Sequence, residues 1–396
     1  MIKRQMLFIC CFLFLVFAVI SSVSAEGDIL TCSTVTNNET LNDTTNDTSN
    51  ETSNSTNSSE NGTNVTVPFK AYWMLASSVA GANASDLHAK GITDIFVLVR
   101  GTTGKTYLYE LQQAINKFNP VGIKVHAWIV CFKDTNGNFV DPSGYYCYTK
   151  SVVKTIKYWG KKKIAYKSWK KVKWKKVRGK WRYKWKKVTK YRYKYGWLYK
   201  NVYNNVTVKG YDQTFNNNLI NFIKTTATYN VDGIHLDYVR YSGVASKNHA
   251  AWQEPGGETA AVNAVTSFVS RVNSTIKTIN PDILLSAAVM PECANNAYYY
   301  GQDYGRLADY VDFFVPMIYE GNYNANNAWI TSVTEYIVAH AKGKPVYAGL
   351  TTYLSDTYPT IEDPDLSADV QSAKLGGAEG FVLFRYGTVG YADVPE

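Results

Sequence analysis

The residues best placed to do chemistry lie between positions 231 and 241, where a carboxylate ends a short apolar run. In an extended segment, Ile234 and Leu236 point one way, and His235 and Asp237 point the other way. An ionised aspartate in such a run is costly unless it is paired or used. Asp237 is therefore a candidate catalytic carboxylate, and a structural ion pair with Arg240 is the alternative interpretation.

Cleavage of a glycosidic bond commonly needs two carboxyl groups, one protonated and one ionised. With Asp237 as nucleophile or charge stabiliser, the chain offers Glu320 and Glu292 as proton donors, each just after an expected strand. We favour Glu320 and keep Glu292 as the alternative. An ordinary solvated loop residue is the competing interpretation of Glu320.

Aromatic and polar side chains near the expected strand ends are candidates for binding a sugar. Aromatic rings offer an apolar face to a pyranose, and arginine and histidine can donate to its hydroxyls. An arginine beside Asp237 should also keep the pKa of that carboxyl low. Rings that only cap a core are the alternative. The candidates are Trp73, Arg100, His126, Trp128, His235, Arg240, Tyr319 and Tyr386.

Eight short apolar runs alternate with longer amphipathic stretches from residue 67 onward. Strands are expected at 71–78, 94–100, 124–132, 233–239, 283–290, 313–319, 345–351 and 380–384. Helices are expected at 105–117, 214–227, 260–279, 328–341 and 366–375, with two short ones near 82–90 and 302–309. The alternation predicts a (β/α)8 TIM barrel over residues 67–396, whose catalytic side chains collect at the C-terminal ends of the strands.

A basic, aromatic segment at residues 150–210 interrupts this alternation after the third strand. Residues 154–200 hold 21 Lys or Arg and no Asp or Glu, whereas the remaining 21 basic residues are outnumbered by 32 acidic ones. Alternating Tyr and Lys predict β-ribbons with a turn at Arg178–Gly179, one face aromatic and the other cationic. Because the segment follows a barrel strand, it should project from the catalytic face. We expect it to bind an acidic surface polymer; a solvated loop is the alternative.

The first 66 residues resemble export and stalk sequences. Residues 1–25 have a basic start, an apolar core and a small-residue cleavage site, which predicts a signal peptide; an uncleaved anchor is the alternative. Residues 26–66 are rich in Asn and Thr with repeated N-x-S/T sequons, which predicts a disordered, glycosylated stalk. No second membrane span follows, so a secreted or cell-surface location is expected, and that location argues against nucleic acid as a partner.

Cysteines and histidines give no sign of a metal site, and no cofactor is expected. Four cysteines remain after the signal, without a CxxC pair or a histidine cluster. Cys131 and Cys147 are close enough in sequence to close a loop, whereas Cys32 and Cys293 have no obvious match.

Several stretches in order resemble the glycoside-hydrolase-like barrels that are distantly related to α-amylase and α-galactosidase barrels. They are Ala127–Trp128, Phe139–Ser143, Tyr229–Tyr241, Gly301–Tyr304 and Val311–Tyr319. The family often has Pro after the Arg240–Tyr241 pair, where this chain has Ser242. A chitinase-type mechanism is not implied, because Val239 stands where chitinase-type barrels have their proton-donating Glu. In the α-amylase-like pattern Asp237 aligns with the nucleophile, but His235 replaces an Arg.

The resemblance implies a glycoside hydrolase that uses two carboxylates. Together with the expected export, it predicts action on a cell-surface or extracellular polysaccharide. The alternative is an inactive barrel that serves as a carbohydrate-binding or adhesion module. In composition, the Lys/Tyr/Trp block beside an Asn/Thr stalk also resembles surface proteins of methanogenic archaea.

Overall fold

Eight parallel strands form a nearly closed barrel in the computed structural model, which describes residues 68–243 and 257–389. The strand order is β8-β7-β6-β3-β2-β1-β12-β9. Parallel bridges from Phe314 to Val346 and from Met317 to Gly349 bring the two outer strands together. The strands are β1 (Phe69–Met74), β2 (Asp94–Arg100), β3 (Lys124–Val130), β6 (Gly233–Asp237), β7 (Leu284–Val289), β8 (Phe313–Pro316), β9 (Tyr347–Thr351) and β12 (Gly380–Phe384).

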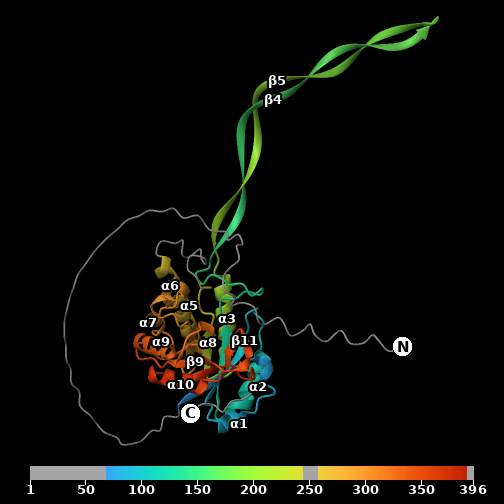
Figure 1. The fold of residues 1–396 in the computed structure, drawn as a ribbon. Helices are drawn as coiled ribbons and strands as arrows, with labels where there is room; N and C mark the ends of the chain where they lie inside the picture. The colour runs from blue at the N-terminus through green and yellow to red at the C-terminus, as the bar shows by residue number, and fades with distance from the viewer. Residues whose placement is uncertain (1–67, 244–256, 390–396) are drawn as a thin grey trace, which may run out of the picture. The chain divides into compact units, whose positions relative to one another are not determined.

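Helices follow most of the strands and pack around them (Figure 1). They are α1 (Ala84–Ala89), α2 (Leu108–Phe118), α3 (Thr214–Ala227), α5 (Gly257–Ile279), α6 (Asn296–Tyr300), α7 (Tyr304–Leu307), α8 (Glu320–Tyr323), α9 (Asn327–His340) and α10 (Leu366–Leu375). The TIM-barrel prediction is therefore confirmed. The expected bounds differ most at β1, which ends at Met74 because a 3-10 turn at Ala76–Ser78 replaces the rest of the expected strand.

Side chains alternate between two cores, as a strand with both faces buried requires. Ile234 and Leu236 on β6 point outward into the large cluster between strands and helices. His235, the residue between them, lies against Trp73 and Phe96 inside the barrel. The interior cluster is small and mostly aromatic, built on Ala71, Trp73, Phe96, Trp128, Phe313, Val315 and Val382.

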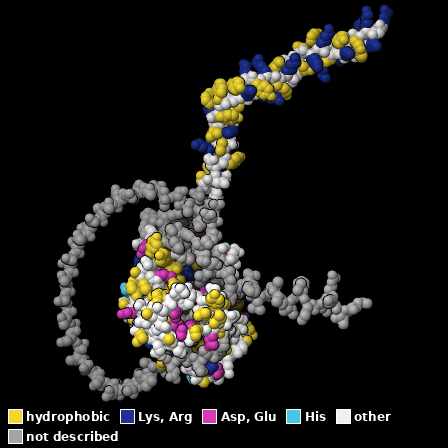
Figure 2. All heavy atoms as spheres, in the orientation of Figure 1, with side chains coloured by type: hydrophobic (Ala, Val, Ile, Leu, Met, Phe, Trp, Pro, Cys, Tyr) yellow, Lys and Arg dark blue, Asp and Glu magenta, His cyan; other side chains and the backbone are white. Residues whose placement is uncertain are grey.

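Residues 147–208 form a second compact unit, a two-stranded ribbon of β4 (Tyr145–Val177) and β5 (Lys180–Tyr211). Arg178 and Gly179 both have positive φ, which suits the two-residue turn expected there. Along the ribbon, yellow apolar and dark-blue basic side chains are interleaved (Figure 2). The expected separation into an aromatic and a cationic face is wrong, because cations contact rings on both faces, as detailed below.

Two of the expected segments lie outside the described residues, and the expected Cys131–Cys147 disulfide is wrong. The signal peptide at 1–25 and the stalk at 26–66 fall outside them. Cys131 is a free, fully buried thiol, so a disulfide with Cys147 is not formed. No helix within residues 68–243 and 257–389 has the length and hydropathy needed to cross a membrane.

Gly233 opens β6 where a larger residue would strike a neighbouring strand. A Cβ there would lie 2.1 Å from His126 Nδ1 and 2.7 Å from His126 Cε1. We expect Gly233→Ala to lower the free energy of unfolding by about 1–3 kcal/mol, as overpacking does. Gly81→Ala is the control, because a Cβ at Gly81 has no atom within 4 Å. Urea unfolding measures both variants, and equal stabilities would contradict this packing.

Candidate active site

Asp237 is the last residue of β6, and its carboxylate is held by two N–H donors. Trp128 Nε1 donates to Oδ2 at 3.0 Å, and the backbone N–H of Tyr238 donates to Oδ1 at 2.7 Å. The side chain is only 6% exposed. Trp128 comes from β3, whose residue Val130 pairs with Asp237. Two neighbouring strands therefore fix one carboxylate at their common end.

Burial dominates the electrostatics of Asp237. It raises the pKa of the carboxyl above its usual range, although the Trp128 and Tyr238 hydrogen bonds and the positive charge of Arg240 act in the opposite direction. Arg240 thus favours the ionised form, as expected, but the expectation of a low pKa is wrong. Burial makes the ionised form of Asp237 costly, and the two N–H donors and Arg240 offset part of that cost.

Glu292, just past β7, is a second carboxyl with a raised pKa. Tyr300 Oη donates to Oε1 at 3.0 Å and Tyr323 Oη donates to it at 2.8 Å. The other oxygen, Oε2, is buried and has no hydrogen-bond partner within the described residues. Burial raises the pKa of Glu292, and it outweighs both tyrosine hydrogen bonds and the charge of Arg240. An oxygen without a partner in a group of raised pKa is a natural place for a proton.

Hydrogen bonds tie the chain after β6 to the chain after β7. Gln302 is fully buried, and its Nε2 donates to the carbonyls of Val239 and Ala288 at 3.4 and 3.2 Å. Its Oε1 accepts from the N–H of Met290 at 3.0 Å. The Tyr304 hydroxyl donates to the Met290 carbonyl at 2.6 Å. The segments that carry Asp237 and Glu292 are thereby fastened to each other.

A non-glycine residue in the left-handed region directly follows each of these two carboxyl residues. Tyr238 has φ of 50° and Cys293 has φ of 51°. Such residues cost free energy and cluster at functional sites, where the surrounding structure imposes them. The chain just after β6 and just after β7 therefore adopts a backbone conformation that costs free energy, as chains at functional sites often do.

The positive charge of Arg240 acts on both carboxyl groups, Asp237 and Glu292. Its guanidinium carbon is 5.0–5.3 Å from the ring centroids of Phe139, Tyr238 and Tyr300, and Nη1 donates to the Tyr241 carbonyl at 2.9 Å. Its charge lowers the pKa of both Asp237 and Glu292. The alternative of a simple ion pair with Asp237 is not what these contacts describe, because the cation faces three rings.

Glu320 begins α8, and it interacts with carboxyl groups near α10. It shares a hydrogen bond with Asp369 on α10, and Asp363 is a further neighbour. Burial, together with these two carboxyls, raises the pKa of Asp369 to about 9. Asn327 Nδ2 also donates to Asp369 Oδ1 at 2.8 Å. Glu320 therefore belongs to a carboxyl cluster beside α10.

Asp356 is a site residue that sequence reasoning missed. It lies between β10 (Tyr353–Ser355) and β11 (Tyr358–Glu362), a small hairpin after β9 that the strand pattern did not reveal. Tyr353 Oη donates to its Oδ1 at 2.7 Å, and Asn322 Nδ2 donates to its Oδ2 at 2.9 Å. Its charge, like that of Asp237, raises the pKa of Tyr319. The available signal was a polar Ser-Asp-Thr stretch soon after an expected strand.

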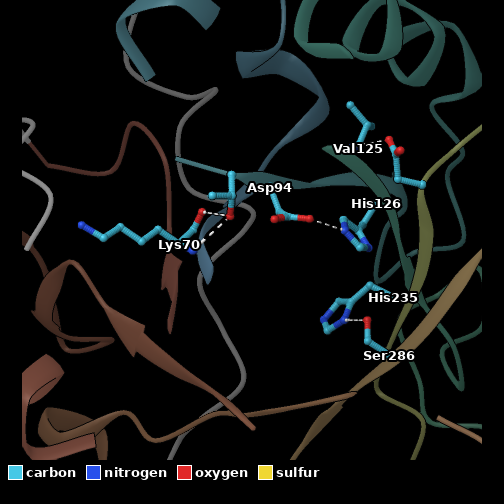
Figure 3. Close-up of polar contacts among 8 residues, drawn as sticks. Lys70, Asp94, Val125, His126, His235 and Ser286 are labelled. Atoms are coloured by element: carbon cyan, nitrogen blue, oxygen red, sulfur yellow. Dashed lines mark hydrogen bonds and ion pairs between the residues drawn. The ribbon is translucent and has the colours of Figure 1, made fainter. Parts of the chain in front are cut away.

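His126 and His235 lie inside the barrel and are fully buried (Figure 3). His126 Nε2 is 2.8 Å from Asp94 Oδ1, and His235 Nδ1 is 2.9 Å from Ser286 Oγ. Burial, followed by the nearby His126, lowers the pKa of His235 well below its usual range, so its ring is neutral. Both side chains belong to the barrel interior.

The other expected binding residues divide by their contacts. Trp73 is 2% exposed and is part of the interior core. Arg100 donates to the carbonyls of Val130, Cys131 and Lys133, which fastens β2 to the chain after β3. Tyr386 meets Tyr72 edge-on. Tyr319 stacks on Phe384, and its pKa is raised by burial and by nearby groups that include Asp237.

Of these candidates, Trp128, Arg240 and Tyr319 interact with Asp237, and Glu292 shares with Asp237 the influence of the Arg240 charge. Among the residues that the structure describes, no group of three or more His, Cys, Asp or Glu is arranged to hold a metal ion. The titratable groups that the structure describes around Asp237 and Glu292 are the two carboxyls, Arg240 and several phenols.

A family model and solved structures show what this chain is similar to. A family model described as "Putative glycosyl hydrolase domain" matches residues 175–345, which include Asp237, Glu292 and Glu320. The search of curated proteins finds no match. The resemblance to glycoside hydrolase barrels is thereby confirmed.

Solved structures show the same fold at low identity. The PgaB (BpsB) glycoside hydrolase domain from Bordetella bronchiseptica is 10% identical with a TM-score of 0.50, covering 81% of this chain and 95% of that one. A class V chitinase from Pseudomonas fluorescens Pf-5 is 12% identical with a TM-score of 0.46, covering 82% and 96%. The likeness to the Bordetella domain supports the barrel fold alone.

The Trp128 indole should stabilise ionised Asp237 specifically. Because the folded-state pKa of Asp237 is raised, the stability contributed by its protonated form is present at low pH and is lost as pH rises through that pKa. Trp128→Phe removes a donor to the charged form, so its loss of stability should grow by about 1–3 kcal/mol as pH rises through that range.

Unfolding free energy measured against pH tests this prediction, with Asp237→Asn as the control background. In that background the effect of Trp128→Phe should no longer depend on pH in this range. A loss of the same size at every pH in both backgrounds would show that the indole contributes packing alone.

Proposed function

We propose that this protein is an exported glycoside hydrolase that cleaves a polysaccharide with Asp237 and Glu292. The observation that carries the proposal is Glu292 Oε2, a buried oxygen without a partner in the described structure, on a carboxyl whose pKa is raised. A group of this kind stays protonated where an ordinary glutamate has ionised. Support for the reaction class comes from the glycosyl hydrolase family model.

In the proposed reaction Glu292 donates its proton to the leaving glycosidic oxygen. The bond from that oxygen to the anomeric carbon breaks as positive charge develops on the carbon, and ionised Asp237 stabilises the charge or attacks the carbon. Water then adds to the anomeric carbon, and the proton that it loses restores the acid. The Trp128 and Tyr238 donors favour the ionised form of Asp237 against the effect of burial, and they fix its direction. Once its proton is gone, Glu292 becomes charged, and Arg240 together with the two tyrosine hydroxyls stabilises that carboxylate.

Asp356 and Tyr319 are proposed to bind sugar hydroxyls beside the two catalytic carboxyls. Asp356 is held on both oxygens by Tyr353 and Asn322, which fixes its direction while leaving lone pairs for further hydrogen bonds. Tyr319 has its ring against Phe384, and its raised pKa keeps the hydroxyl protonated as a donor. Both residues therefore offer polar groups on ordered supports.

The surface location and the polymer partner are further parts of the proposal. Export rests on the signal-like residues 1–25 and the sequon-rich stretch at 26–66. Binding of an acidic surface polymer rests on residues 154–200, where 21 basic side chains occur without a carboxylate. An enzyme tethered to its polymer in this way would cleave it at high local concentration.

An inactive barrel that serves as an adhesion module is the second candidate. The observation that favours it is the ribbon, where Trp169 is 61% exposed and Trp185 is 64% exposed. Rings exposed to this extent on a charged ribbon suit binding irrespective of any chemistry in the barrel. The two candidates differ in whether sugar is released.

Substitution of either catalytic carboxyl should abolish sugar release and spare polymer binding. We expect Asp237→Asn and Glu292→Gln each to lower kcat by roughly 10²- to 10⁴-fold, in line with loss of acid–base chemistry. Glu320→Gln is the matched control and should keep nearly full activity, because Glu320 contacts the Asp369 cluster. Reducing ends released from a panel of neutral and acidic polysaccharides provide the assay.

Two outcomes of that assay would contradict the assignment. Loss of activity in Glu320→Gln but not in Glu292→Gln would move the acid to α8. Wild-type protein that binds the panel but releases no sugar from any member would favour the adhesion module.

The pH profile should respond to Tyr323. The hydrogen bond from its hydroxyl lowers the pKa of Glu292, so Tyr323→Phe should raise that pKa. Since the acid must be protonated to act, the alkaline limb of kcat/KM should move to higher pH in the variant. Tyr298→Phe, at an exposed tyrosine on the same helix as Tyr300, is the control. A shift to lower pH would contradict the role of Glu292.

A further inference from the structure

The ribbon of β4 and β5 is antiparallel with a constant register along most of its length. Contacts join Thr155 to Asn201 and Lys167 to Thr189, so the position on β5 falls by as many residues as the position on β4 rises. Trp159 and Trp197 meet edge-on between them with ring centroids 5.3 Å apart. Because side chains alternate along a strand, the odd-numbered residues of both strands share one face, here called the odd face.

On the odd face, lysines of β4 lie over aromatic rings of β5. Lys163 Nζ is 4.2 Å from the ring centroid of Tyr191, and Lys171 Nζ is 4.9 Å from that of Tyr183. The same pattern recurs farther from the turn, where Lys157 lies over Trp197, and closer to the turn, where Lys173 lies over Trp181. The seven β4 lysines of this face are Lys157, Lys161, Lys163, Lys167, Lys171, Lys173 and Lys175.

On the opposite face, here called the even face, the roles of the strands are exchanged. Lys184 lies over the ring of Trp174 at 5.8 Å, and Arg192 lies over Tyr166 at 5.8 Å. Lys200 lies over Tyr158 at 5.5 Å. Eight β5 cations form this row, namely Lys180, Arg182, Lys184, Lys186, Lys190, Arg192, Lys194 and Lys200.

Each face therefore carries a row of cations, supplied mainly by β4 on the odd face and mainly by β5 on the even face. Within residues 154–200, Lys187 of β5 adds to the odd face, and four even-numbered β4 lysines add to the even face, namely Lys154, Lys162, Lys170 and Lys176. Successive members of a row two residues apart are about 7 Å apart along the strand. No carboxylate lies within residues 154–200 to neutralise either row. Rings beside the cations stay open to solvent, as Trp159 at 58% and Tyr193 at 64% show. Both faces have the charge to attract a polyanion, and both have rings beside that charge.

We infer that the ribbon is a two-sided linker that holds one chain of an acidic polysaccharide on each face and so bridges two polymer chains. This inference rests on the polymer binding proposed above. Carboxylates or sulfates of the polymer would pair with the cation rows, and pyranose rings would stack on the neighbouring aromatic rings. Bridging follows from the exchange of roles between the strands, because neutralising one face leaves the other still charged.

A polysaccharide is favoured over a nucleic acid as the occupant because the same chain carries a glycosyl-hydrolase-like barrel. Nucleic-acid bases also stack on aromatic rings beside lysines, so a polynucleotide is a necessary arm of the test. A neutral polysaccharide offers stacking without charge and tests the contribution of the cation rows.

Light scattering of the full chain mixed with polygalacturonate tests the inference. Scattering should rise to a maximum as polymer is added and fall in excess polymer, because excess chains occupy each face separately. Dextran should give no maximum. The odd-face variant Lys157→Glu/Lys163→Glu/Lys171→Glu and the even-face variant Lys184→Glu/Arg192→Glu/Lys200→Glu should each lose the maximum while still binding polymer in a pull-down. The spread variant Lys163→Glu/Lys171→Glu/Lys200→Glu reverses as many charges without concentrating them on one face, and it should keep part of the maximum.

The outcomes distinguish failure of bridging from failure of polymer binding. Binding of polygalacturonate by wild type without a scattering maximum would overturn bridging and leave polymer binding intact. Absence of any binding would overturn both. A maximum that survives in both single-face variants, with circular dichroism showing intact strands, would also overturn bridging. A larger maximum with single-stranded polynucleotide than with polygalacturonate would overturn the assignment of an acidic polysaccharide.

Discussion

Burial of a carboxylate at the end of β6 is the constraint on which the proposed site depends. Asp237 is removed from water, and its ionised form is supported by two aimed N–H groups and one nearby arginine. In water-poor surroundings such donors act more strongly than in solvent, and a charge without them would be too costly to keep. The indole of Trp128 thus has two roles, closing the barrel interior and donating to the carboxylate.

The same physical terms separate the two candidate acids. Glu292 is buried beside Arg240 and two phenols, with one oxygen lacking a partner in the described structure, which favours a proton on that group. Glu320 sits beside other carboxyls, and the group with the strongly raised pKa there is Asp369. Position after a strand was a weak guide to this difference, because both glutamates follow barrel strands. The surrounding groups decide it, and they come from α6, α8 and the end of β6.

The fold could be predicted from the sequence because apolar β-branched runs and amphipathic stretches alternate eight times. Candidate site residues could be predicted where they lie on a strand or within a few residues of its end, as with Asp237, Trp128 and Arg240. The pairing of Glu292 with Tyr323 joins residues 31 positions apart, and no local pattern encodes it. Asp356 was missed because its strands are only three and five residues long. The two-residue alternation of the ribbon was evident from the sequence. The pairing of particular cations with particular rings depends on the register of β4 against β5, and alternation alone does not fix that register.

Titration of Glu292 by carbon-13 NMR, set against the alkaline limb of sugar release, tests the two-carboxylate account most directly. We predict that the Glu292 carboxyl titrates above the ordinary glutamate range and that its midpoint coincides with the alkaline limb, in wild type and in Tyr323→Phe alike. A Glu292 that titrates in the ordinary range, or an alkaline limb that stays in place when the Glu292 titration moves, would contradict its role as the acid.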